Sequence, residues 1–150
     1  MCDDCSPVLV SACLLGTACR YDGTGKANKR VLAFAKTRPL IPVCPEQLGG
    51  LATPRPPAER SGERVFTKNG EDVTTAFCRG AEETLRLAAL FGCRLAILKA
   101  NSPSCGCGWI YDGSFSGRLV PGDGVTAALL QQNGVTVLTE ADELWRKRTP

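Results

Sequence analysis

The sequence predicts a single compact α/β domain of Rossmann-like type, in which helices flank a mostly parallel sheet. Short apolar runs alternate with segments of helical periodicity, and this alternation is typical of a doubly wound parallel sheet. The length of 150 residues matches the expectation of about 150 residues per domain. We therefore interpret residues 1–150 as one domain, with residues 1–6 as a flexible tail.

The strands are predicted from four short apolar runs bounded by turn-forming residues. These runs cover residues 7–12, 40–43, 94–99 and 135–138. Pro42 lacks an amide donor, so the second run is predicted to be a short strand or an edge strand. Residues 109–113 are expected to form a further strand or an excursion from the sheet.

Helices are predicted where apolar residues recur every three or four positions. The predicted segments are 28–36, 72–91, 125–132 and 141–148. The longest helix is expected to begin at Asp72 as its N-cap and to end at Gly92. The first helix is expected to bury Val31, Leu32 and Ala35 on one face.

The segments between these elements are predicted to be loops, because Gly and Pro interrupt both periodicities. Residues 45–62 contain four prolines and two adjacent glycines, and this stiff composition favours a loop that forms a fixed wall. Residues 64–68 and the Asn69-Gly70 pair predict a small hairpin or turn.

The chain contains nine cysteines and no histidine. Without histidine, Ser-His-Asp and Cys-His catalysis, Cys2His2 zinc sites and histidine-ligated iron are excluded. A signal peptide and an apolar stretch of about 20 residues are also lacking. We therefore expect a cytoplasmic protein, with no membrane partner, whose thiols serve a metal, catalysis or the core. The mostly scattered basic residues and the formal charge of +3 argue against a nucleic-acid partner.

Three cysteines each follow an apolar run and stand beside a loop rich in Gly, Pro or Ser. They are Cys13, Cys44 and Cys105. The carboxyl ends of parallel strands meet at one edge of a sheet, so these thiols are expected to converge in one crevice. Three thiolates can hold a cubane [4Fe-4S] cluster and leave the fourth iron free for a substrate. The alternative interpretation is three buried core thiols, since Cys is often buried.

The remaining cysteines are interpreted differently. Cys78 and Cys93 are expected in the core, and the Cys2 and Cys5 pair lies in the predicted tail without a second ligand pair. Cys19 and Cys107 each lie near a proposed ligand in sequence. Either could replace a ligand or supply a fourth thiolate.

A carboxylate lies close to the second of these cysteines. Glu46 follows Cys44 by two residues, and it is a candidate general base for a reaction beside the cluster. Glu59 is a second candidate for the same role. For both Glu46 and Glu59 the alternative interpretation is a charged side chain on the surface of a loop. Ser102, just before Cys105, carries a hydroxyl that would ordinarily cap a turn.

Five motifs together resemble one bacterial family, the 2-thiouracil desulfurases (desulfidases), long catalogued as a domain of unknown function. The motifs cover residues 11–16, 20–23, 42–46, 54–59 and 102–106, and the resemblance extends from Val8 to about Glu140. It implies a [4Fe-4S] cluster held by Cys13, Cys44 and Cys105. It also implies Glu46 and Ser102 as catalytic candidates, while the family pattern needs neither Cys19 nor Cys107.

The resemblance implies desulfuration of a thiocarbonyl compound such as 2-thiouracil to the oxo base, with release of hydrogen sulfide. The open iron would bind the substrate sulfur, Glu46 would deprotonate a water, and Ser102 would orient substrate or stabilise developing charge. Two other classes stay open. An iron–sulfur carrier or sensor would need a fourth protein ligand, and a structural zinc protein could use four of the cysteines. The oligomeric state and the physiological substrate are left open as well.

Overall fold

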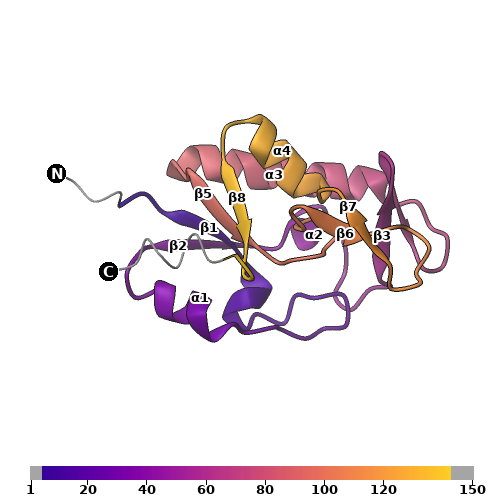
Figure 1. Cartoon of the computed structure of the whole chain (residues 1–150), viewed down its shortest axis with the longest axis horizontal. Helices are drawn as coiled ribbons and strands as arrows, with labels where there is room; N and C mark the ends of the chain where they lie inside the picture. The colour runs from indigo at the N-terminus through magenta and orange to yellow at the C-terminus, as the bar shows by residue number, and fades with distance from the viewer. Residues whose placement is uncertain (1–4, 143–150) are drawn as a thin grey trace.

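The computed structural model describes residues 5–142, and within them a four-stranded parallel sheet forms the centre of the molecule (Figure 1). In spatial order its strands are β2 (Leu40–Val43), β1 (Val8–Ser11), β5 (Leu95–Leu98) and β8 (Thr136–Thr139). Each neighbouring pair is parallel. The predicted α/β class with a mostly parallel sheet is therefore confirmed, and Pro42 lies in an edge strand as expected.

The order of the strands reverses beside β1. From β1 the chain moves outward to β2 on one side, whereas from β5 it moves outward to β8 on the other side. The connections that leave β1 and β5 therefore diverge. In open α/β sheets such a reversal opens a crevice outside the carboxyl ends of the strands.

Helices cover both faces of the sheet (Figure 1). On one face lie α3 (Thr74–Phe91) and α4 (Val125–Gln132), and on the other lies α1 (Lys29–Phe34). Alternate residues of β1 serve the two faces, since Leu9 packs towards α3 and α4 while Val8 and Val10 pack towards α1. Burying one such side chain fully contributes about 1.5–3 kcal/mol, so both layers are held mainly by apolar burial.

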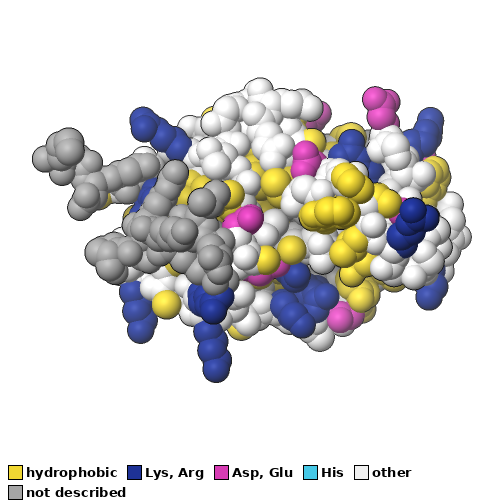
Figure 2. Space-filling model, viewed as in Figure 1, with side chains coloured by type: hydrophobic (Ala, Val, Ile, Leu, Met, Phe, Trp, Pro, Cys, Tyr) yellow, Lys and Arg dark blue, Asp and Glu magenta, His cyan; other side chains and the backbone are white. Residues whose placement is uncertain are grey.

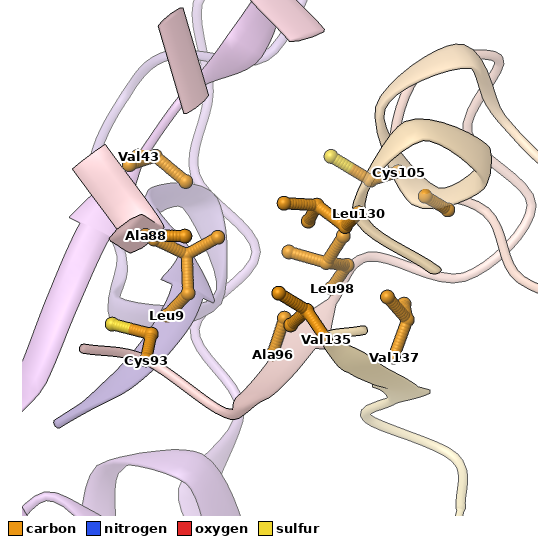
Figure 3. Close-up of a cluster of buried hydrophobic side chains, with 11 residues drawn as sticks. Leu9, Val43, Ala88, Cys93, Ala96, Leu98, Cys105, Leu130, Val135 and Val137 are labelled. Atoms are coloured by element: carbon orange, nitrogen blue, oxygen red, sulfur yellow. The ribbon is translucent and has the colours of Figure 1, made fainter. Parts of the chain in front are cut away.

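Figure 3 shows the buried cluster between the sheet and the α3–α4 layer. Val43 and Cys105 lie at one end of this cluster, and Cys93 and Val135 lie at the other. Val43 is the last residue of β2 and Cys93 precedes β5. The thiol of Cys105 therefore lies at the end of the core where the parallel strands finish.

The short helix α2 (Pro45–Leu48) crosses α3 at a contact between two glycines. A Cβ atom on Gly80 of α3 would overlap the Pro45 carbonyl oxygen, and one on Gly49 would overlap the Ala76 carbonyl oxygen. Only glycine allows the two backbones to approach this closely. The contact fixes α2, and with it the residues that flank Cys44.

Two hairpins complete the described part of the chain, and β3, β6 and β7 mark them at the right of Figure 1. They pair β3 (Ala58–Ser61) with β4 (Arg64–Thr67) and β6 (Trp109–Tyr111) with β7 (Leu119–Pro121). The expectation that residues 45–62 are irregular is therefore wrong, because they contain α2 and β3. The first hairpin turns at Gly62. The turn predicted at Asn69-Gly70 is confirmed, since the chain reverses there after β4 and Phe66 pairs with Asp72 in an antiparallel bridge.

Further expectations concern three helices and the N-terminal tail. The helix over 125–132 is confirmed with its predicted bounds. In α1 the buried residues are Val31 and Phe34, so burial of Leu32 and Ala35 is wrong. The helix expected over 141–148 lies outside the described residues except for its first two positions, as does most of the predicted tail.

The visible surface combines dispersed charge with an exposed apolar region (Figure 2). Lys and Arg side chains are spread around the face that Figure 2 shows. Trp109 and Leu119, on the paired strands β6 and β7, are among the exposed large hydrophobic residues. Among residues 5–142, no helix is long and apolar enough to cross a membrane.

Candidate functional site

A cavity of about 420 Å³ lies where β1, β2 and β5 end. Its lining includes Ser11 and Val43, the last residues of β1 and β2, and Lys99, which follows β5. The described cysteines that line it are Cys13, Cys19, Cys44 and Cys105. The structure thus brings the three predicted cysteines together and adds a fourth thiol.

Cys13 lies in a short 3-10 helix, Ala12–Leu15, that continues directly from β1. The side chain is buried, and burial raises the pKa of the Cys13 thiol to about 11, although the nearby charge of Lys99 acts in the opposite direction. Without a bound metal this thiol is therefore protonated at neutral pH. A metal ion would have to displace its proton, as thiolate coordination generally requires.

Cys44 is the N-cap residue of α2, and Pro45 occupies the first helical position. Proline is favoured there because the first amides of a helix have no intrahelical acceptor. Cys44 is half-buried, and its thiol donates to the Cys19 carbonyl oxygen at 3.6 Å. The junction of β2 and α2 therefore presents this sulfur to the cavity.

Cys105 is held by a tight turn whose hydrogen bonds come from Ser102. The Ser102 Oγ accepts from the amides of Ser104 at 3.1 Å and Cys105 at 3.0 Å. Burial raises the pKa of the Cys105 thiol, and a hydrogen bond from Ser11 acts in the opposite direction. The Ser102 oxygen is thus used to build the turn, while its hydroxyl proton stays available to a partner in the cavity.

The start of α4 anchors the loop that carries Cys105. The amides of Val125 and Thr126 donate to the carbonyl oxygens of Pro103 and Ser104, each at 2.9 Å. The buried Ser104 and Thr126 hydroxyls are 2.8 Å apart. These contacts fix the Cys105 loop to α4, so the position of the Cys105 sulfur depends on the packing of α4.

Glu46 lies in the first turn of α2 and forms an ion pair with Arg55. Arg55 Nε is 3.1 Å from Glu46 Oε1, and the two side chains are 6% and 19% exposed. The same guanidinium donates to Thr53 Oγ1 at 2.9 Å and to the Cys19 carbonyl oxygen at 2.9 Å. Arg55 therefore fixes the Glu46 carboxylate relative to the loop that carries Cys19.

Glu59, the second candidate carboxylate, has a different environment. It is 9% exposed, and its Oε1 accepts from the amides of Gly113 at 3.0 Å and Phe115 at 3.1 Å. Phe115 has a φ of 57°, a left-handed conformation that is uncommon for a bulky residue. Glu59 therefore stabilises the strained turn between β6 and β7, which forms part of the cavity wall.

The outer wall of the cavity combines aromatic and basic side chains. The aromatic residues are Tyr21, Tyr111 and Phe115, and the basic residues include Arg20 and Lys68. The Arg20 guanidinium lies 5.8 Å from the centre of the Tyr21 ring, a distance at which a cation and an aromatic ring attract. Flat rings of this kind can hold a planar substrate by stacking.

Several of these residues had no predicted role. Arg55 belongs to a motif that supports the family resemblance, but its partner Glu46 is nine residues away and no sequence periodicity joins them. Lys68 and Tyr111 reach the cavity from the two hairpins. The sequence did indicate part of this wall, because the stiff, proline-rich composition of residues 45–62, which include Arg55, predicted a fixed wall beside Cys44.

Cys19 and Cys107, the two cysteines near proposed ligands in sequence, differ in whether they line the cavity. Cys19 is 2% exposed and lines the cavity. Burial, and then the neighbouring Cys44 and Cys13, raise the pKa of the Cys19 thiol to about 12. Cys107 lies away from the cavity lining, where Gln131 Nε2 donates to its sulfur at 3.1 Å.

Among residues 5–142, no three Cys, Asp or Glu side chains are grouped as ligands of one metal ion. A cubane cluster has a different requirement. Its thiolates bind separate iron atoms, so its ligands surround a volume rather than a point. Three thiols distributed around one cavity match that requirement.

Comparison with known proteins gives three matches. The family model described as 2-thiouracil desulfurase matches residues 8–142. The uncharacterized protein YbbK of Bacillus subtilis (strain 168) is 44% identical over 143 residues, covering 89% of this chain and 95% of its own. The solved structure of the [4Fe-4S]-dependent thiouracil desulfidase TudS is 48% identical, covers 94% of both chains and superposes with a TM-score of 0.87. The chain belongs to the 2-thiouracil desulfurase family.

Proposed function

We propose that the protein is a [4Fe-4S]-dependent thiouracil desulfurase. It converts a thiocarbonyl compound such as 2-thiouracil, with one water, to the oxo base and hydrogen sulfide, without net oxidation or reduction. The observation that carries the proposal is the presence of Cys13, Cys44 and Cys105 in one cavity with an ion-paired Glu46. Membership in the family and the similarity to TudS support the same reaction.

The donor set of the cavity fits the cluster. Thiolates are the usual ligands of iron–sulfur clusters, and the proposed ligands are Cys13, Cys44 and Cys105. Cys13 and Cys44 lie within two residues of the ends of β1 and β2, and Cys105 lies in the loop that follows β5, so the three thiols come from separate segments. When bound, the cluster would supply an iron without a protein ligand, and this iron would attract the soft thiocarbonyl sulfur and polarise the C=S bond.

The residues of the chain supply the proton transfer and the orientation. Glu46 accepts a proton from the water that attacks the thiocarbonyl carbon, and Arg55 holds its carboxylate in one orientation through Nε. The Ser102 hydroxyl donates towards charge that develops on the substrate. Tyr111 and Phe115, on the opposite hairpin wall, hold the planar ring.

The cavity distinguishes this proposal from an iron–sulfur carrier or sensor. An electron carrier needs its cluster and a path for electrons, but it does not need an open volume beside the cluster. Here about 420 Å³ lies between the thiols and a wall of aromatic, basic and carboxylate side chains. That combination is typical of a small-molecule site.

The test is anaerobic purification followed by an assay with 2-thiouracil. We expect a brown protein with about four irons and four acid-labile sulfides per chain. Added 2-thiouracil should lose its thiocarbonyl absorbance while uracil and sulfide form in equal amounts. A colourless protein that binds one zinc and cannot be reconstituted would contradict the proposal. A stable cluster whose spectrum does not respond to 2-thiouracil would instead favour a carrier or sensor.

A further inference from the structure

Two of the cavity cysteines, Cys19 and Cys44, are in contact with each other. The Cys44 thiol donates to the Cys19 carbonyl oxygen at 3.6 Å, and Cys44 is among the neighbours that raise the pKa of the Cys19 thiol. The Cys19 carbonyl also accepts from the Arg55 guanidinium at 2.9 Å. The fold therefore keeps these two cysteines side by side at the cavity.

The two thiols differ in their access to small molecules. Cys44 is half-buried and faces the cavity, whereas Cys19 is almost completely buried. A small oxidant that enters the cavity therefore meets Cys44 more readily, and Cys19 is the cysteine that contacts Cys44 from within the fold. A reactive thiol with a second thiol beside it is the usual arrangement of a reversible redox pair.

The proposed cluster leaves Cys19 without a function. The ligands of a cubane bind different iron atoms, and the proposed fourth iron is kept for the substrate, so Cys19 holds no corner of the cluster. The contact between Cys19 and Cys44 instead suits a bond between the two sulfurs, provided that the cluster is absent.

We propose that Cys19 and Cys44 form an oxidation site, with Cys19 as the resolving thiol. Hydrogen peroxide oxidises the Cys44 sulfur to the sulfenic acid and releases one water. The Cys19 sulfur then attacks the sulfenic sulfur, the S–S bond forms, and a second water leaves. The two thiols thus give up two electrons and two protons, which reduce one peroxide to two waters.

The consequence for the enzyme rests on the proposed function, because it assumes that Cys44 is a cluster ligand. The disulfide removes Cys44 from the ligand set, so cluster binding and the disulfide exclude each other. It also protects Cys44 from the sulfinic and sulfonic acids, which thiol reductants do not reverse. Reduction of the disulfide would return a protein that can bind the cluster again.

The test uses the whole chain, stripped of iron anaerobically with a chelator and treated with one equivalent of hydrogen peroxide. We expect the mass to fall by two hydrogens and a disulfide-linked peptide to join Cys19 to Cys44. Trypsin releases residues 37–60 with Cys44 as their one cysteine, but it leaves Cys13 and Cys19 together in residues 1–20. Chymotrypsin, which cleaves after leucine at positions 14 and 15, separates those two cysteines.

Cys19→Ser and Cys107→Ser are the matched variants, since Cys107 lies outside the cavity lining. In Cys107→Ser we expect the same linked peptide, and dithiothreitol followed by iron and sulfide should restore the visible spectrum. In Cys19→Ser, treated with an excess of hydrogen peroxide, the Cys44 sulfur should gain two or three oxygens, and dithiothreitol should not restore cluster binding.

Two results would overturn the proposal. One is a wild-type disulfide that joins Cys44 to Cys13 in place of Cys19. The other is oxidation of Cys44 to the sulfonic acid at the same rate with and without Cys19. Peptide mapping requires no cluster, so a chain that forms the Cys19–Cys44 bond but never binds iron would contradict the proposed function and leave this inference intact.

Discussion

At the scale of single residues, the buried guanidinium of Arg55 connects the cavity wall to the proposed base. It is 6% exposed and donates to Glu46, to Thr53 and to the backbone of the Cys19 loop. A buried charge is tolerated only when it is paired and hydrogen-bonded. The Glu46 carboxylate is therefore both a candidate for catalysis and the counter-charge that Arg55 requires.

The substitution Glu46→Gln separates these two roles. The amide oxygen of Gln can still accept from Arg55 Nε, so we expect the cluster to assemble and the substrate to perturb its spectrum. Turnover should fall by about 10²–10⁴-fold, the usual contribution of a general base. Iron content, the spectral shift and the desulfuration rate are measured on one preparation. Glu59→Gln is the matched control and should retain turnover, because its amide oxygen can still accept from Gly113 and Phe115. Near wild-type turnover in Glu46→Gln would remove Glu46 from the mechanism.

Replacement of Arg55 by Met tests the ion pair itself. The variant leaves a largely buried carboxylate without its partner, and breaking such a pair costs about 3–5 kcal/mol. We expect the free energy of unfolding, measured with urea, to fall by that amount. The double variant Glu46→Gln, Arg55→Met should recover part of the loss. An unchanged urea midpoint in Arg55→Met would show that the pair does not stabilise the fold.

The buried thiols predict how the stability of the cluster-free protein depends on pH. In the folded state the pKa of Cys13 is raised to about 11 and that of Cys19 to about 12, from an ordinary value of 9.0. The unfolded chain therefore loses these protons at lower pH than the folded chain does. The stabilisation is complete below about pH 9 and is lost as the pH rises towards the folded values. The urea midpoint should fall between pH 9 and pH 11, and it should fall less in Cys19→Ala. A midpoint that rises would contradict the assignment.

At the scale of elements, the crossing of α2 and α3 positions both Cys44 and Glu46. The two helices touch through Gly49 and Gly80, and a Cβ on either glycine would overlap a backbone carbonyl oxygen. A backbone oxygen cannot move aside as the end of a flexible side chain can. The short helix that carries Glu46 is therefore placed by a glycine in a helix distant in sequence.

The variant Gly80→Ala tests this placement. Alanine improves helix propensity by about 1 kcal/mol, but overpacking costs about 1–3 kcal/mol or more, so we expect a net loss of stability. Displacement of α2 should also reduce iron content after reconstitution. Glu82→Ala, on an exposed position of the same helix, is the control and should change neither property. A more stable Gly80→Ala protein with full iron content would show that the crossing is not tight.

The strands and helices differ in how far the sequence could predict them. Apolar runs predicted the four parallel strands. The reason is clearest for the central strands β1 and β5, which are buried at every position and are therefore apolar on both faces. The strand β3 has the sequence Ala-Glu-Arg-Ser and no apolar alternation, so its conformation depends on pairing with β4. The helix α1 has only six residues, and so short a helix does not define its buried face by periodicity.

The candidate site likewise contains residues that the sequence could predict and residues that it could not. The positions of Cys13 and Cys44 follow from the ends of strands, and the sequence carries that information. Cys105 lies in the loop after β5, and its place also depends on the contacts of that loop with α4. The difference between Cys19 and Cys107 depends on the paths of two loops, and both cysteines lie within a few residues of a proposed ligand. The Arg55–Glu46 ion pair also depends on a loop path, so no local pattern could have identified it.

At the scale of the whole molecule, the cavity gathers segments from most of the described chain. It lies beside the reversal of strand order, and its wall is completed by the two hairpins. The three proposed ligands come from segments that follow β1, β2 and β5. Binding of a cluster would therefore connect three parts of the fold, so cluster assembly and folding are coupled.

The most direct test of the central claim is a set of single cysteine-to-alanine variants, purified anaerobically and assayed for iron, sulfide and 2-thiouracil turnover. We expect Cys13→Ala, Cys44→Ala and Cys105→Ala each to lose the cluster or keep a partial one, and to be inactive. Cys19→Ala, Cys78→Ala and Cys107→Ala should keep about four irons per chain and should turn over substrate. A full cluster in Cys13→Ala, together with an empty site in Cys19→Ala or Cys107→Ala, would contradict the account.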